Sequence, residues 1–131
     1  MRRKIIIALA VLLMAALAVG ITAFVYSTGE VFNGERIKNP DSYSLVFDRM
    51  NQSDSHTLSL KEGEGLCVEF AIEKGRVDLV VENSRGSVIY RGNKIDSGIF
   101  DLIIPADGDY TISVNAKNAQ GFIMASVSEN G

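Results

Sequence analysis

Apolar and polar residues alternate along most of the chain after Tyr43, and this period of two constrains the fold more than any other feature. Such alternation puts every second side chain on the same face of an extended strand, which is typical of half-buried β-structure. Eight short segments show it, with these apolar residues: Leu45 and Phe47; Leu58 and Leu60; Leu66, Val68 and Phe70; Val77, Leu79 and Val81; Val88 and Tyr90; Phe100, Leu102 and Ile104; Tyr110, Ile112 and Val114; and a last run from Gly121 to Val127. In the last run the pattern leaves two choices for the inward face, Phe122 with Met124, or Ile123 with Ala125 and Val127.

Clusters of Gly, Asn and Asp separate these segments, as in Lys61–Gly65, Asn83–Gly86 and Asp107–Gly108, and Lys74-Gly75 ends another segment. These residues tolerate the backbone angles that tight turns need. Short strands at regular spacing, with no helical period among them, predict an all-β fold. We expect an antiparallel, eight-stranded, jelly-roll-like β-sandwich over residues 41–128, preceded by a linker over residues 27–40.

The N-terminal segment, residues 1–26, differs from the rest of the chain. Arg2, Arg3 and Lys4 precede an uncharged run of 22 residues, Ile5–Tyr26. As a helix this run would extend about 33 Å, enough to cross the roughly 30 Å hydrocarbon core of a bilayer. Basic residues on the N-terminal side predict that everything after Tyr26 lies outside the cytoplasm.

Two interpretations of this helix remain open. An uncleaved signal anchor would hold the chain in the cell membrane as a single-pass protein with its C-terminal domain outside. A cleaved signal peptide would release a secreted domain, although its apolar core is usually only about 7–15 residues long. Both interpretations predict the same extracytoplasmic β-domain.

Charge and cysteine content narrow the classes of protein further. Setting aside Arg2, Arg3 and Lys4 changes the net charge of the whole chain, −3, to −6 for the remainder. An acidic domain is poorly suited to nucleic acid, which rewards clusters of Lys and Arg. With Cys67 as the only cysteine, the chain can form no internal disulfide. Secreted domains of animals usually contain several disulfides, so a bacterial origin is favoured.

The sequence offers no organised catalytic set, and we expect no enzymatic activity and no cofactor. His56 is the only histidine, in a polar stretch where a solvated loop position is expected. Alternation puts Cys67 on the face opposite Leu66 and Val68, beside Glu69, whose charge raises a thiol pKa and so disfavours a nucleophile.

Metal and ligand candidates are sparse. Four carboxylates in the C-terminal half offer oxygen ligands for a calcium ion at one end of the sandwich: Asp96, Asp101, Asp107 and Asp109. Tyr43 and Tyr90 are the aromatic candidates for stacking on a sugar, because Tyr110 and Phe100 fall on the inward face. Phe122 and Met124 belong to the C-terminal strand, which we expect at a sheet edge, where it is free to pair with a partner chain.

Three motifs resemble those of the bacterial pre-peptidase C-terminal domains, a group of small GOLD-like extracytoplasmic β-sandwiches. They are the Val-Asp-Leu strand Val77–Val81, the hairpin Gly86–Tyr90 and the Gly-x-Tyr strand within Pro105–Val114. The resemblance covers about 70 residues and implies a sandwich fold and a non-catalytic accessory role. Together with the anchor, it predicts a membrane-tethered binding or accessory domain, with a protein partner or, alternatively, a cell-wall glycan as its ligand.

Overall fold

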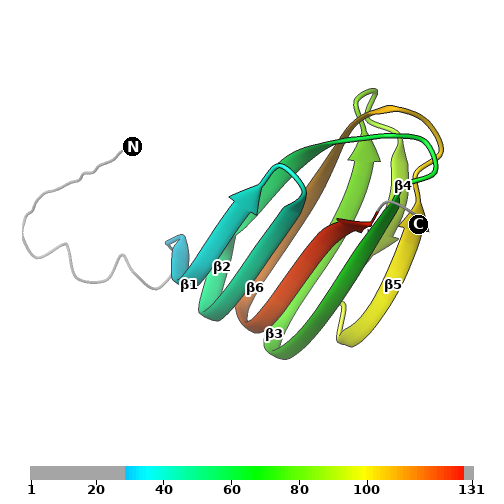
Figure 1. The fold of residues 1–131 in the computed structure, drawn as a ribbon. Helices are drawn as coiled ribbons and strands as arrows, with labels where there is room; N and C mark the ends of the chain where they lie inside the picture. The colour runs from blue at the N-terminus through cyan, green and yellow to red at the C-terminus, as the bar shows by residue number, and fades with distance from the viewer. Residues whose placement is uncertain (1–28, 129–131) are drawn as a thin grey trace, which may run out of the picture. The chain divides into compact units, whose positions relative to one another are not determined.

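Three long strands dominate the fold, and each runs through both parts of a single bent sheet (Figure 1). The structure, a computed structural model, describes residues 29–128. Its six strands are β1 (Val31–Asn39), β2 (Ser42–Leu60), β3 (Gly65–Asn83), β4 (Val88–Gly92), β5 (Ser97–Ile103) and β6 (Gly108–Ser128). All pairings are antiparallel, which confirms the predicted all-β antiparallel class.

The sheet has the order β1-β2-β6-β3-β4, with β5 also paired to β3. In the first part, here called the β1 layer, β1, residues 42–47 of β2, residues 121–128 of β6, residues 65–72 of β3 and β5 pair in turn. In the second part, the β4 layer, the remaining halves of β2, β6 and β3 pair with one another and with β4. Strand β6 is therefore central in both layers.

The long strands bend sharply where their registers shift. The shifts lie between Phe47 and Gln52 in β2 and between Ile72 and Arg76 in β3, and both face the middle of β6. Eleven residues of straight strand would span about 36 Å. Yet the Tyr43 hydroxyl donates a hydrogen bond to the Asp54 carboxylate on the same strand, so β2 doubles back and its two halves face each other.

One hydrophobic core fills the space between the layers. Its fully buried side chains come from the long strands and from Ile104, directly after β5. The largest are Tyr43, Leu45, Met50, Leu58, Leu66, Leu79, Ile104, Ile112 and Ile123. In the C-terminal half of β6 the inward residues are Ile123 and Ala125, so Phe122 and Met124 point outward. The inward series predicted from alternation is buried in β2, β3 and β6.

The predicted number of strands was wrong. Six of the eight expected segments are the two halves of β2, β3 and β6. Each of these strands bends at a bulge but continues through it as one strand. Lys74-Gly75, expected to end a strand, lies at such a bulge in β3. Residues 31–39, expected as part of a linker, form β1, an edge strand whose mixed polar composition hides its alternation.

The predicted transmembrane or signal helix, residues 1–26, lies outside the described residues. Within residues 29–128, no helix has the length and hydropathy needed to span a bilayer.

The bend requires a glycine at position 75, and this requirement can be tested. Its φ is +80°, and a Cβ there would lie 2.2 Å from the carbonyl oxygen of Asn118 in β6. We expect Gly75→Ala to lower the free energy of unfolding by about 3 kcal/mol, because strain and a backbone clash add. Gly63, with φ +90° and open space around it, is the matched control, and Gly63→Ala should cost only about 1 kcal/mol. Equal losses in chemical denaturation would contradict the close approach at the bend.

Candidate functional site

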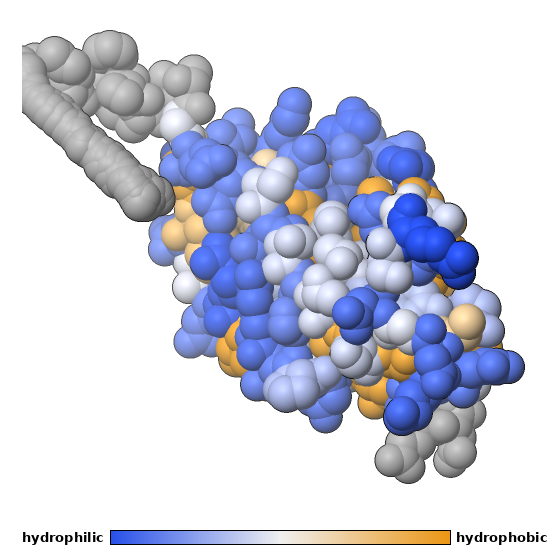
Figure 2. Space-filling view, turned by 90° about the horizontal axis from the view of Figure 1, so that it is seen from above, coloured by the Kyte–Doolittle hydropathy of each residue, from blue (hydrophilic) through white to orange (hydrophobic). Residues whose placement is uncertain are grey.

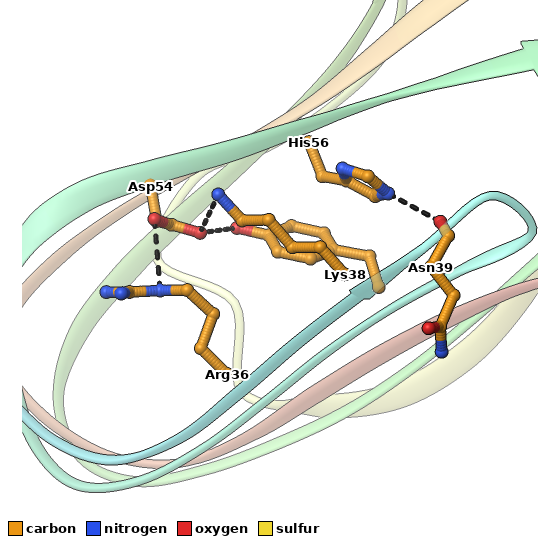
Figure 3. A network of polar contacts seen from close by, with 6 residues as sticks. Arg36, Lys38, Asn39, Asp54 and His56 are labelled. Carbon is orange, nitrogen blue, oxygen red and sulfur yellow. Dashed lines mark hydrogen bonds and ion pairs between the residues drawn. The ribbon is translucent and has the colours of Figure 1, made fainter.

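Charged side chains close the open side of the interior, where β1 in one layer faces the edge of β2 in the other (Figure 3). Arg36 Nε lies 3.2 Å and Lys38 Nζ 3.5 Å from the Asp54 carboxylate, which also accepts the Tyr43 hydroxyl. The Asp54 side chain is only 12% exposed, whereas Arg36 and Lys38 are each about one-third exposed. One carboxylate thus joins two strands of the β1 layer to the β4 layer.

Aromatic rings extend this cluster. The Arg36 guanidinium lies 4.3 Å from the centre of the Phe32 ring, within the range of a cation–π contact. The pKa of Tyr43 is raised well above its usual range, first by burial and then by the hydrogen bond to Asp54 and the charge of that carboxylate. The phenol therefore stays protonated and serves as a donor.

His56 belongs to the same cluster, which corrects the expected solvated loop position. It lies in β2, half-buried, with Nε2 2.7 Å from the carbonyl oxygen of Asn39 and its ring 5.4 Å from that of Tyr43. A carbonyl oxygen only accepts hydrogen bonds, so Nε2 of His56 is the donor in this contact. Every member of this cluster is held by another, so we interpret it as a structural closure.

The outer face of the β1 layer combines exposed apolar side chains with carboxylates. Val46, Met124 and Ile99 are 49%, 46% and 65% exposed. Register places Val46 beside Phe122, and Glu69 between Met124 and Ile99. We call this surface the acidic-apolar face and define it by Glu35, Ile37, Val46, Glu69, Ile99, Asp101, Phe122 and Met124.

The outer face of the β4 layer is polar instead. A depression of about 500 Å³, here called the polar hollow, is lined mainly by hydroxyl, amide and charged groups: Ser53, Ser55, Asp78, Arg91, Asn93, Ser113 and Asn115. The pKa of Asp78 is lowered, first by the hydrogen bond from the backbone N–H of Lys94 and also by Arg76. Figure 2 shows one face of the molecule, on which residues of intermediate hydropathy occupy the middle and hydrophobic residues reach the surface in separate patches.

The predicted partner-binding residues fall into different environments. Tyr43 is 1% exposed and cannot stack on a ligand, and Tyr90 is half-buried with its ring stacked 4.1 Å from that of Phe100. Phe122 and Met124 were expected on an edge strand, but β6 pairs with β2 and β3 on its two sides. The prediction that these residues pair with a partner at a strand edge was therefore wrong. Their side chains do lie on an outer face of the sheet.

The four calcium candidates are not brought together. Asp107 accepts the backbone N–H of Glu62, and Asp109 accepts the Ser59 hydroxyl at 2.8 Å. Asp101 lies opposite Cys67 in the β3–β5 pair, and the backbone carbonyl of Asp96 accepts from Ile72. Within the described part of the chain, no three His, Cys, Asp or Glu side chains are grouped as a metal site.

Most of the acidic-apolar face was not predicted from the sequence. Val46 and Ile99 interrupt the alternation on the outward side of their strands, next to the inward Leu45 and Phe100. These apolar residues, at positions expected to face solvent, were the sequence feature that could have indicated this face. Glu35 and Ile37 could not be placed, because β1 was not recognised as a strand.

Comparisons with known proteins give little guidance. No family model matches the chain, and no curated protein matches it. The solved structures that are similar in part include the following two. One is PliG from Aeromonas hydrophila, a periplasmic inhibitor of g-type lysozyme, at 15% identity over 74% of this chain and 88% of that one, with a TM-score of 0.47. The other is a cupin domain from Bordetella pertussis Tohama I, at 12% identity over 76% and 94%, with a TM-score of 0.33.

Similarities at this level assign neither a family nor a function to this chain. Neither structure belongs to the pre-peptidase C-terminal domains, and the resemblance to that group stays a prediction.

The closure around Asp54 predicts a stability cost. Asp54→Ala should lower the free energy of unfolding by about 2–3 kcal/mol, because it leaves two cations and a buried phenol without their shared acceptor. The control is Arg76→Ala, which breaks the ion pair with Asp78, where the side chains are 52% and 29% exposed. This control should cost less than about 1 kcal/mol. If chemical denaturation shows similar losses for both variants, the closure does not stabilise the fold.

Cys67 offers a separate test of the acidic-apolar face. Burial, a hydrogen bond to Asp101 and the charges of Asp101 and Glu69 raise the pKa of its thiol, so little thiolate exists at neutral pH. We expect alkylation of the folded protein to be slower than that of a free thiol, and Asp101→Asn to accelerate it. An Asp101→Asn variant that reacts at the unchanged rate, with its fold intact by circular dichroism, would contradict this arrangement.

Proposed function

We propose that this protein is a non-enzymatic, extracytoplasmic binding domain that holds a partner protein on its acidic-apolar face. The observation that supports this proposal is the group of exposed apolar side chains on one face of the sheet. Val46, Met124 and Ile99 project from β2, β6 and β5, and the half-buried ring of Phe122 lies between Val46 and Ala71. Exposed apolar side chains gathered on one face of a folded domain are typical of interaction sites.

The strands beneath this face favour specific binding. β6 and β3 are paired on both sides in the β1 layer, so the side chains of Met124 and Glu69 are held on a rigid support. A preorganised surface loses little conformational entropy when a partner binds. A protein surface also offers enough matching apolar area to cover side chains spread over several strands, which a small molecule does not.

The location of the domain is part of the same proposal. The run Ile5–Tyr26 behind Arg2, Arg3 and Lys4 supports export, with the domain tethered to the outer side of a bacterial membrane if the run stays uncleaved. Cleavage would give a secreted form of the same domain. In either form the acidic-apolar face is available outside the cytoplasm.

The proposal predicts that one substitution on the face abolishes partner capture. In-cell crosslinking of the full-length chain, followed by mass spectrometry, should yield a reproducible protein adduct that Met124→Glu removes. The matched control is Ser55→Glu, which places the same charge in the polar hollow and should leave the adduct unchanged. An adduct that survives Met124→Glu and disappears with Ser55→Glu would contradict the proposal, as would robust hydrolase activity of the purified protein.

A cell-wall glycan is the second candidate ligand, and the polar hollow is the observation that favours it. Asp78, Arg91 and Asn115 offer donors and acceptors that suit sugar hydroxyls. Its lining contains no aromatic ring, however, and Tyr43 is buried. Retention of the protein on purified wall material, lost in Arg91→Ala and kept in Met124→Glu, would support the glycan over the protein partner.

A further inference from the structure

Every charged residue at an outward position of the β1 layer is acidic. Glu35 on β1, Glu69 on β3 and Asp101 on β5 lie on this side, and none of the outward positions in the five paired segments holds Lys or Arg. Within residues 29–128, no ion pair neutralises any of these three carboxylates. The acidic-apolar face, as defined by its eight residues, therefore carries only negative charges.

The basic residues of the domain lie outside these five paired segments or point inward. Arg49 lies opposite Asn33 of β1 at the bend, where its guanidinium donates hydrogen bonds to Asn118 Oδ1. Arg36 and Lys38 alternate with Glu35 and Ile37 on β1 and point inward to Asp54. Arg76 and Lys117 pair in register next to the bend and line a pocket with Asp78. The charge separation is thus built into the alternation of the strands and does not depend on flexible surface side chains.

Apolar and acidic residues are direct neighbours on this face. Glu69 lies between Met124 and Ile99, and Glu35 lies opposite Val46. Cross-strand neighbours have their Cβ atoms about 4.5–5.5 Å apart. A partner that covers Met124 and Ile99 must also remove water from Glu69, and a buried carboxylate without a counter-charge is strongly unfavourable.

We infer that the partner on the acidic-apolar face is a protein whose contact surface presents Lys or Arg side chains next to apolar ones. This inference rests on the proposed function and specifies the chemistry of the partner. Cations beside the apolar contacts satisfy Glu35 and Glu69 when water leaves, and the field of the face accelerates the encounter. An anionic lipid surface or a nucleic acid would be repelled by the same carboxylates.

The test is a selection of displayed random peptides on the full-length chain in detergent. We expect the peptides that bind to be enriched in Lys and Arg next to apolar residues, relative to the unselected library. Their binding should be lost in Met124→Glu and weakened about tenfold in the double variant Glu35→Gln and Glu69→Gln, which removes two carboxylates. Glu62→Gln, in the turn after β2, removes one exposed carboxylate away from the face and should have no effect. Circular dichroism of each variant verifies the fold.

The outcomes separate this inference from the proposed function. Peptides that need Met124 but show no enrichment in basic residues overturn the inference and leave the protein-binding face in place. If no selected peptide depends on Met124, both are overturned. Sedimentation of the same preparations tests self-association: a dimer that Met124→Glu converts to a monomer would make a second copy of the chain the occupant and overturn the inference.

Discussion

The bend shared by β2, β3 and β6 is the constraint on which the rest of the structure depends. Because three neighbouring strands interrupt their registers at the same level, one sheet folds over and supplies both walls of a single core. Gly75 permits this with a positive φ and a backbone so close to β6 that no Cβ fits between them. The same bend gives the molecule two outer faces built from the same three strands. One face is acidic and apolar, and the other is polar.

The inner side of β1 protects this edge strand from pairing with other chains, whereas its outer side belongs to the proposed binding face. Inward-pointing charges are one way in which proteins discourage an edge strand from pairing with other chains. Arg36 and Lys38 do this while pairing with Asp54 across the interior. On the outer side, Glu35 and Ile37 extend the acidic-apolar face instead. The proposed partner therefore binds a sheet face, which the central strand β6 supports, and not a strand edge.

The sequence predicted the inward residues of β2, β3 and β6 well, because burial on one face enforces strict alternation in antiparallel strands. It could not predict that six of its segments were halves of three strands, since a bulge and a turn use the same Gly and Asn residues. β1 was missed because Arg36 and Lys38 occupy inward positions that a core strand would fill with apolar side chains. The outward Val46 and Ile99 were visible in the sequence, but only the pairing of distant strands places them on one face.

The most direct test of the account is a photo-crosslinking amino acid incorporated at single positions of the full-length chain in living cells. Placed at Ile99, which is 65% exposed on the acidic-apolar face, it should form an adduct with another protein, and that protein should be rich in Lys and Arg at the crosslinked surface. Placed at Ser113, in the polar hollow on the other layer, it should form none. A protein adduct at Ser113 with no adduct at Ile99 would contradict the account, because the acidic-apolar face would then bind no partner protein in the cell.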